Sequence, residues 1–362
     1  MTTISILALG GDGIGPEILA QGLRIARHVA EKSGFLLDID HDLLHGASYD
    51  THGVFCTDAV LDKAKAADAV LVGAVGGHAW DHVRIAGGAE AQDGLMYLRY
   101  HLQAYLGLRP AEAWKELSSL SPFRCDVVAG ADIMIMREMC GGAMFARQRG
   151  QRIHQGKRQG YDLTAYDEDE VARFAHGGFA LARRRRRQLV SCDKSNVMES
   201  YKLWRDVVGD VAKHYPDVEF KHMLADHCAY QMMMQPTAFD VVLCCNQLGD
   251  VFSDLTGTVS GSLGMLPSAC LASNPADGPS FGIYESTSGS APDIAGKGIA
   301  NPIGMILSVA MMFDYTIGRP DLWQAVHRAI EQTLADGIKT QDIGGIATTV
   351  EITDAILDRL VA

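Results

Sequence analysis

The sequence lacks features that mark several common functional classes. Aromatic residues are only 7% of the 362 residues, and 32 basic residues stand against 44 acidic ones, which gives a net charge of −12. A chain of this charge repels nucleic acids and anionic membrane surfaces. No basic segment precedes the first apolar residues, and no apolar run has the length of a membrane span. We therefore expect no nucleic-acid partner, no membrane partner and no targeting signal.

Cysteine pairs with C-x-x-C spacing are also missing. The cysteines lie in apolar or mixed surroundings, which predicts buried, reduced thiols and a cytoplasmic protein. They are Cys56, Cys125, Cys140, Cys192, Cys228, Cys244, Cys245 and Cys270.

Familiar nucleotide and hydrolase motifs are incomplete. The run GGDGIG at 10–15 fails the G-x-G-x-x-G pattern because Asp12 occupies the place of the middle glycine. A phosphate loop ending at Lys297 fails because Ala291 and Gly298 stand where a glycine and a serine or threonine are required. H-E-x-x-H, G-x-S-x-G and cysteine-based zinc spacings are not found. A standard Rossmann site, a P-loop and a zinc hydrolase are thus disfavoured.

What is present is an alternation of apolar strands and helical periods. Residues 4–8 form a strand pattern that ends in glycines, and Pro16 and Glu17 open a helix that continues to residue 31. Further strands are predicted at 69–73, 127–128, 133–136, 189–192, 220–225 and 241–245, and helices at 60–66, 167–183 and 199–214. The pattern predicts a doubly wound, parallel α/β fold with a mainly helical last third. The length fits two packed lobes.

Two segments are rich in basic residues. Residues 146–166 contain arginine, glutamine, glycine and histidine but few large aliphatic residues, which indicates a solvated hairpin or loop. An RNA-binding arm is the other interpretation, and the acidic chain argues against it. The five arginines at 183–187 are predicted to close a helix, where cations suit the negative end of the helix dipole.

Three groups of residues are candidates for chemistry. Asp250 and Asp254 are four residues apart, so on a helix both carboxylates share one face and could bind Mg²⁺ or Mn²⁺, or they could only cap the helix. The second group consists of Arg99, Arg109 and Arg137. Several arginines suit a substrate with two carboxylates, although each could instead form a surface ion pair. Lys194 directly follows a predicted buried strand, where it could act as a base or simply reach solvent.

Seven blocks of sequence, in order, together resemble the β-decarboxylating dehydrogenases, that is, the isocitrate/isopropylmalate dehydrogenases, and most of all the isopropylmalate members. The blocks are GGDGIGPE at 10, LRP at 108, MRE at 136 with GG at 141, DKSN at 193, LGDVFSD at 248, GSLGMLPSA at 261 and GSAPDIAGKGIANP at 289. The resemblance runs from Ile4 to about the C-terminus. It implies an α/β fold of two domains with the active site in the cleft between them.

The resemblance also implies a division of the chain and a partner. Residues 1–104 and 261–362 would form the cofactor-binding domain, and residues 105–260 the substrate and dimerisation domain. Residues 146–166 would be a β-arm that clasps the partner subunit. A homodimer with shared active sites follows, because the family delivers one metal ligand and one lysine across the dimer interface.

Roles can be carried over residue by residue. Asp250 and Asp254 match two family metal ligands, and Asp226 matches the ligand that comes from the partner. The three arginines match those that hold the malate carboxylates of a dicarboxylate substrate, and Lys194 matches the base-side lysine. Leu95 and Met96 match apolar residues beside the C3 substituent, which favours a 3-substituted malate similar to 3-isopropylmalate.

The resemblance implies NAD as the cofactor. Asp293 matches the aspartate that accepts the ribose hydroxyls in NAD-dependent members and would repel a 2′-phosphate. The cofactor-binding residues implied are Gln92, Asn196, Ser288, Gly289, Ser290, Ala291, Asp293 and Asn301.

The chain departs from the family at several of these positions. Met144 stands where the family has its catalytic tyrosine, and a thioether donates no proton. His227 replaces an asparagine beside the metal ligand and could serve as an acid or as a hydrogen-bonding neighbour. Ser288 replaces a histidine near adenine, Gly107 an asparagine, and Gln92 a glutamate near the nicotinamide ribose.

Three functional hypotheses follow. The first is NAD- and metal-dependent oxidation and decarboxylation of a 3-substituted malate with an apolar side chain. The second is a dehydrogenase that stops after oxidation, or that acts on tartrate, homoisocitrate or an unusual alkylmalate. The third is a low-activity paralogue that binds a dicarboxylate. Three unused carboxylates in one cluster would repel each other, which counts against the third hypothesis.

Overall fold

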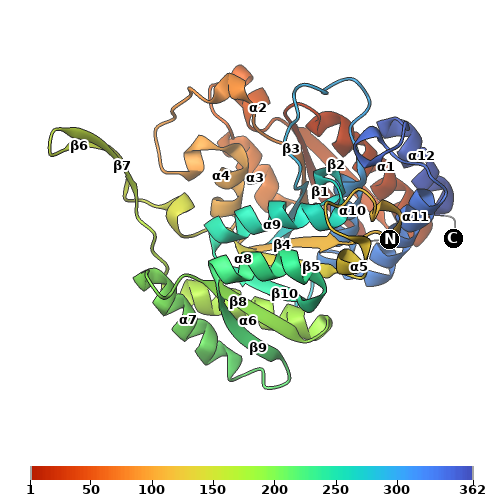
Figure 1. Cartoon of the computed structure of the whole chain (residues 1–362). Helices are drawn as coiled ribbons and strands as arrows, with labels where there is room; N and C mark the ends of the chain where they lie inside the picture. Colours follow the sequence, from red (N-terminus) through yellow and green to blue (C-terminus); the bar gives the residue numbers. More distant parts are fainter. Residues whose placement is uncertain (1, 361–362) are drawn as a thin grey trace.

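The computed structural model describes residues 2–360 and has an α/β architecture, as predicted, with a large sheet covered by helices (Figure 1). The strands are β1 (Thr3–Gly11), β2 (Leu36–Asp42), β3 (Ala69–Ala74), β4 (Leu106–Glu112), β5 (Asp132–Glu138), β6 (Arg149–His154), β7 (Lys157–Asp162), β8 (Gln188–Asp193), β9 (Glu219–Leu224), β10 (Val241–Cys244), β11 (Pro267–Leu271) and β12 (Gly282–Ser286). The α-helices are α1 (Gly15–Ser33), α2 (Gly46–His52), α3 (Asp58–Ala66), α4 (Gly94–His101), α5 (Cys125–Val128), α6 (Glu168–Arg184), α7 (Glu199–Ala212), α8 (Ala225–Met234), α9 (Asn246–Ser260), α10 (Ile303–Tyr315), α11 (Pro320–Ala335) and α12 (Thr349–Arg359).

The main sheet is mixed, which corrects the expectation of a wholly parallel sheet. Its order is β2-β1-β3-β12-β11-β4-β5-β10-β8-β9. The outer pairs are parallel, but β11 is antiparallel to both β12 and β4, and β4 is antiparallel to β5. The parallel strands of the two halves therefore run in opposite directions, and the reversal lies in the centre of the sheet.

The predicted start of the first helix is confirmed. α1 begins at Gly15 with Pro16 in its first turn and Glu17 near its positive end, and it ends at Gly34 in the left-handed conformation. Gly13, at φ 56°, brings the preceding loop close to Ser290: a Cβ there would lie 1.9 Å from the Ser290 carbonyl oxygen. The glycine-rich turn therefore packs against a distant loop.

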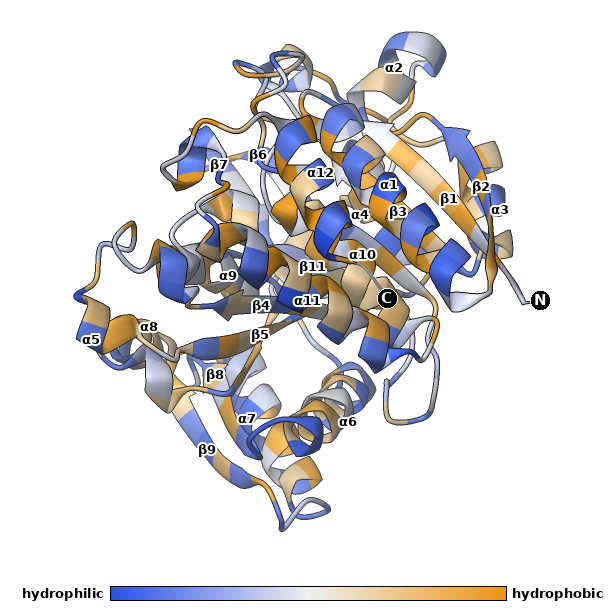
Figure 2. Cartoon of the chain, turned by 90° about the vertical axis from the view of Figure 1, so that its right-hand side faces the viewer, coloured by the Kyte–Doolittle hydropathy of each residue, from blue (hydrophilic) through white to orange (hydrophobic). Residues whose placement is uncertain are grey.

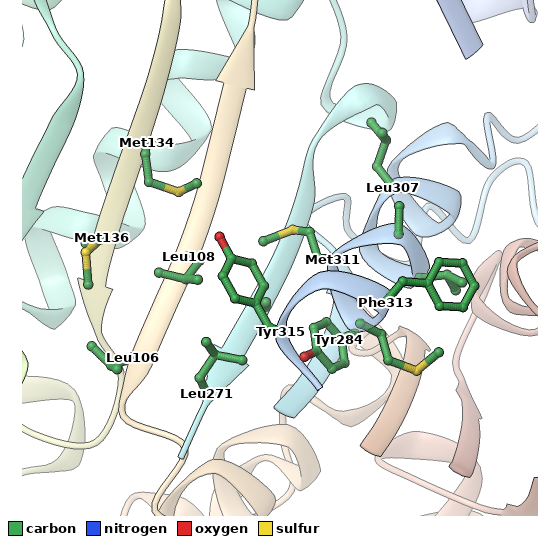
Figure 3. Close-up of a cluster of buried hydrophobic side chains, with 14 of the residues drawn as sticks. Leu106, Leu108, Met134, Met136, Leu271, Tyr284, Leu307, Met311, Phe313 and Tyr315 are labelled. Atoms are coloured by element: carbon green, nitrogen blue, oxygen red, sulfur yellow. The ribbon is translucent and has the colours of Figure 1, made fainter. Parts of the chain in front are cut away.

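A continuous hydrophobic core joins the two halves of the sheet. Figure 3 shows side chains of β4 and β5 beside those of β11, β12 and α10, and all belong to one cluster of buried residues. The labelled members are Leu106, Leu108, Met134, Met136, Leu271, Tyr284, Leu307, Met311, Phe313 and Tyr315. In Figure 2, β1 is largely hydrophobic, whereas α1 alternates hydrophilic and hydrophobic residues, as expected for a helix that covers one face of a sheet.

The polar segment at 146–166 is a hairpin, as one of its two interpretations predicted. β6 and β7 pair in an antiparallel two-stranded sheet that extends away from the rest of the chain (Figure 1). The residues of both strands are exposed. The arginine run closes α6, and Arg185 is anchored by an ion pair of 2.7 Å with the buried Asp240.

Two local expectations need correction. Residues 127–128 belong to the short helix α5 and not to a strand, because two apolar residues carry no periodicity that could separate the two states. Cys125 is exposed, whereas the other seven cysteines are buried, and all eight are free thiols. The last third of the chain is mainly helical, as predicted, and it also contributes β11 and β12 to the sheet. Within residues 2–360 no helix is both long and apolar enough to cross a membrane.

The two segments assigned to the cofactor-binding domain, 1–104 and 261–362, contribute neighbouring strands. β2, β1, β3, β12 and β11 form one side of the sheet, and the strands of 105–260 form the other. The pairing of β11 with β4 makes the sheet continuous across this boundary. The division into two domains stays a prediction.

Candidate functional site

A cavity of about 250 Å³ lies where α4, β4, β5 and α9 meet the chain after β12. The three predicted arginines all line it: Arg99 comes from α4, Arg109 from β4 and Arg137 from β5. All three are buried. The structure therefore brings together buried cationic side chains that are separated in the sequence.

Arg137 is held by α9. Its Nε and Nη2 donate to Asn246 Oδ1 at 2.9 and 2.8 Å, and its Nη1 forms an ion pair with Asp250. Gly249 makes this packing feasible, because a Cβ there would lie 2.7 Å from the Cβ and Cγ of Arg137. The glycine before Asp250 thus lets α9 approach β5 and places the carboxylate beside the arginine.

The other two arginines are only partly satisfied. Arg99 forms a buried ion pair with Glu285, and Arg109 Nη1 donates to Ser253 Oγ at 2.9 Å. Among the residues that the structure describes, the Nε atoms of Arg99 and Arg109 are buried without a hydrogen-bond partner. Buried donors of this kind are costly unless a ligand accepts from them.

Repulsion within the arginine group favours an anionic ligand. Burial, followed by the charge of Arg109, lowers the pKa of Arg137 to about 10, although Asp250 acts in the opposite direction. A substrate with two carboxylates would offset this repulsion, and planar guanidinium groups can each hold a carboxylate through two hydrogen bonds.

The two predicted metal-binding carboxylates lie one helical turn apart on α9. Asp250 lines the arginine cavity, and Asp254 Oδ1 lies 4.0 Å from Arg109 Nη1. The pKa of Asp254 is raised, first by burial and also by the charge of Asp250, although the charge of Arg109 acts in the opposite direction. Two mutually repelling carboxylates of this kind suit a hard divalent cation. Within residues 2–360 of one chain no three histidine, cysteine, aspartate or glutamate side chains form a metal-binding group.

Asp226, the third predicted ligand, is not part of this cavity. It lies in the first turn of α8 and forms an ion pair with Lys194, which follows β8. The hydrogen bond from Lys194 lowers the pKa of Asp226. Asp226, His227 and Asn196 are exposed. The structure therefore brings Lys194 and Asp226 together, but on a surface separate from the walls of the arginine cavity.

Apolar side chains face the arginines across the cavity. Leu95, Met96 and Met144 all line it. Arg137 Nη2 lies 3.4 Å from the Met144 sulfur, which accepts a weak hydrogen bond. The position that the family gives to a tyrosine thus points into the same cavity as the arginines, and it holds a thioether.

A second cavity, of about 590 Å³, adjoins the first. Ser288 and Gly289 line both cavities, and Ala291 and Asn301 line the second. A long ligand could therefore extend from the arginines along this loop, which suits a dinucleotide. Other predicted cofactor residues lie off these walls: Ser290 is buried behind them, Asp293 is exposed on the same loop and Asn196 is beside Lys194.

Gln92 has a local structural partner. Its amide donates to the Ile85 carbonyl at 2.6 Å and accepts from the Ile85 N–H at 3.2 Å. These two hydrogen bonds hold the backbone at Ile85 against Gln92 in the loop before α4. Gln92 lines two outer cavities, and Asp93 connects these with the arginine cavity.

Sequence reasoning missed several residues around the arginines. Glu285 and Asn246 hold Arg99 and Arg137, and Asp93 lines the cavity between them and the outer cleft. Glu285 is 186 residues from Arg99, so no local pattern could indicate the pair. For Asp93 the sequence did offer a signal: an aspartate that directly precedes a run of residues compatible with a helix marks the start of that helix.

Glu138 follows Arg137 at the end of β5. From its burial we expect the free energy of unfolding to depend on pH. Burial raises its pKa to about 7, although hydrogen bonds from the Cys140 and Gly141 N–H groups lower it. An unfolded glutamate titrates near about 4.3. The folded chain therefore binds more protons between about pH 4.5 and 7, and stability falls as the pH rises through this window.

We expect Glu138→Gln to remove a decline of about 2–3 kcal/mol over that window, measured by urea unfolding at pH 5, 6, 7 and 8. The exposed Glu168 provides the control, since Glu168→Gln should keep the wild-type slope. An unchanged slope in Glu138→Gln would show that this carboxyl ionises normally.

Comparisons with known proteins agree with this geometry. The family described as "Isocitrate/isopropylmalate dehydrogenase" matches residues 5–356. A "3-isopropylmalate dehydrogenase" of Xanthomonas oryzae pv. oryzae is 45% identical over 99% of this chain and 98% of its own, and one of Hydrogenovibrio crunogenus is 42% identical over 99% of both. The structure of an isocitrate dehydrogenase from Methylococcus capsulatus is similar with a TM-score of 0.86 and 28% identity, over 99% of both chains.

Proposed function

The chain belongs to the isocitrate/isopropylmalate dehydrogenase family, and on this premise we propose that it oxidises and decarboxylates a 3-substituted malate, most like 3-isopropylmalate. The cofactors proposed are NAD and a divalent metal ion, Mg²⁺ or Mn²⁺. The observation that carries the proposal is the convergence of three buried arginines and Asp250 on one cavity.

In this proposal the arginines bind the two carboxylates of the malate. The unpartnered Nε donors of Arg99 and Arg109 gain acceptors, and the charge of the substrate relieves the repulsion around Arg137. Leu95 and Met96 then face the C3 substituent, so an alkyl group on C3 removes apolar surface from water. This arrangement supports an apolar side chain.

A homodimer would complete the site. Asp250 and Asp254 supply two carboxylates, and Asp226 and Lys194 of a partner subunit would supply the third carboxylate and a base. Large apolar side chains are exposed near these groups: Val197 after β8, Tyr230 and Met234 on α8, and Val251 on α9, with 53–69% of their surface accessible. α8 and α9 lie side by side (Figure 1), so they offer one continuous surface to a second copy.

Each group in this arrangement has a defined task. When bound, NAD accepts a hydride, and the metal ion stabilises negative charge on the C2 oxygen. The arginines orient the substrate, and Lys194 is suited to take the proton of the C2 hydroxyl. The three arginines are buried, which strengthens their charge interactions with the substrate.

One observation favours a second candidate, oxidation without decarboxylation. The enolate formed when CO₂ leaves must be protonated, and Met144 lines the cavity where the family places a tyrosine. Full turnover would then need another donor, such as water, Lys194 or His227. The two candidates differ in one product, CO₂.

An absorbance assay of NADH formation tests the proposal. We expect turnover with 3-isopropylmalate, NAD and Mg²⁺ or Mn²⁺, its loss on addition of EDTA, and its recovery when excess metal is restored. Turnover that is insensitive to EDTA would contradict the metal assignment. Activity with tartrate or malate but none with 3-isopropylmalate would contradict the substrate assignment.

We also propose a cytoplasmic location. All eight cysteines are free thiols, and seven of them are buried, which suits a reducing compartment.

A further inference from the structure

We infer that Asp93 is a specificity residue of the proposed active site, where its carboxylate disfavours substrates that carry a third carboxylate on C3 and admits neutral C3 substituents. The inference rests on the proposed function and deepens it, because it assigns the class of side chain that the site accepts. Asp93 has no role in the family resemblance described above.

Asp93 lies between the arginine cavity and the two outer cavities. It precedes α4, the helix that carries Leu95, Met96 and Arg99. It lines the arginine cavity and also the two outer cavities that Gln92 lines, which have volumes of about 590 and 950 Å³. The 590 Å³ cavity meant here is not the one lined by Ser288 and Gly289. A substituent that extends from the arginines past Met96 toward the outer cleft therefore meets the Asp93 side chain.

Two backbone hydrogen bonds hold this carboxylate in place. Oδ1 accepts from the N–H groups of Leu95 and Met96, both at 2.8 Å, at the positive end of α4. Donors of this kind stabilise an ionised carboxylate. Asp93 therefore presents a carboxylate whose position is fixed at the start of α4.

The charge of Asp93 is also less compensated than that of its neighbours. Three acidic residues line the arginine cavity, and two of them are paired: Glu285 with Arg99 and Asp250 with Arg137. Among residues 2–360, the only basic side chain within 4.0 Å of the Asp93 carboxylate is His45. No arginine or lysine forms an ion pair with it among these residues, but its charge, like that of Glu285, acts on Arg99, so its field reaches the cavity.

His45 fixes the orientation of Asp93. Its backbone has φ 57° and ψ −125°, a conformation that residues other than glycine rarely adopt. Its buried ring stacks on Phe55 with centroids 4.5 Å apart, and Nδ1 lies 3.5 Å from Asp93 Oδ2 and 3.3 Å from the Gly94 nitrogen. The buried ring thus contacts both the Asp93 carboxylate and the backbone that follows it, which helps to hold Asp93 in position.

The expected consequence is discrimination by charge. Like charges that face each other in a partly desolvated site reduce binding strongly. Isocitrate and homoisocitrate carry a third carboxylate on the C3 side chain, whereas 3-isopropylmalate carries an uncharged isopropyl group. Removing the Asp93 charge should relax this discrimination without removing any arginine.

The test compares wild type with Asp93→Asn, because the asparagine oxygen can still accept from Leu95 and Met96. We expect kcat/KM for isocitrate, relative to 3-isopropylmalate, to rise about tenfold or more in this variant. Asp81→Asn is the matched control: Asp81 is exposed and lines the 950 Å³ cavity but not the arginine cavity. The control should keep the wild-type ratio.

An unchanged ratio in Asp93→Asn, or an equal rise in Asp81→Asn, would overturn the inference. Isothermal titration calorimetry of isocitrate and of 3-isopropylmalate, in the presence of Mn²⁺, tests the role of Asp93 separately from the proposed function. Absence of turnover in wild type would contradict the proposed function alone. In that case, the affinity for isocitrate relative to 3-isopropylmalate is compared between wild type and Asp93→Asn. A higher relative affinity for isocitrate in the variant would still support the charge inference, and an unchanged ratio would overturn it.

Discussion

Asp250→Asn is expected to lower kcat/KM for 3-isopropylmalate about 1000-fold while the protein stays folded. Asparagine lacks the charge that a hard divalent cation prefers, and Arg137 loses its ion-pair partner in the cavity. The Asp250 side chain is 48% accessible, so the substitution leaves no cavity in the core and should change stability little. Steady-state NADH formation and thermal unfolding measure the two effects.

A control separates loss of function from loss of a surface charge. Asp210, on α7, is exposed, and within residues 2–360 its one ion pair is with Lys213, 2.6 Å away. Asp210→Asn should therefore keep wild-type kinetics. An Asp250→Asn enzyme with an unchanged rate would exclude Asp250 as a metal ligand.

Mixing two inactive variants is expected to restore activity. Lys194→Ala and Asp250→Asn should each be nearly inactive, because each removes one half of the proposed shared site. In a mixed dimer, the subunit with Lys194→Ala keeps Asp250 and Asp254, and its partner supplies Lys194 and Asp226. One of the two sites is then intact, so random pairing from equal amounts should give about a quarter of wild-type activity.

Co-expression of the two variants in equal amounts, purification of all dimers together and the NADH assay measure this recovery. A mixture of Asp250→Asn with Asp254→Asn is the matched control, since both residues lie on α9 of the same subunit and no intact site can form. Activity in the Lys194 and Asp250 mixture no higher than in this control would contradict the shared site.

Local patterns predicted much of the chain correctly for identifiable reasons. Pro16 and Glu17 suit only the first turn of a helix, and α1 begins there. Asp250 and Asp254, four residues apart, lie one turn apart on α9, as the spacing required. The polar residues of 149–162 could not fill a core, and they form an exposed hairpin.

Features that depend on distant contacts could not be predicted from local patterns. The antiparallel pairing of β11 with β4 joins residues more than 150 positions apart, and strand direction leaves no trace in the sequence of either strand. The positions of Glu285 beside Arg99 and of His45 behind Asp93 likewise depend on the assembled fold. The separation of Asp226 from Asp250 within one chain was implied by the family resemblance and not by spacing.

The most direct test of the central claim is the number of CO₂ molecules released for each NADH formed from 3-isopropylmalate, with Mg²⁺ or Mn²⁺ present. The account predicts equal amounts, because oxidation leaves a 2-oxo acid with a β-carboxylate that is lost in the same site. NADH formation without CO₂ would contradict decarboxylation and favour oxidation alone, with Met144 as its structural cause.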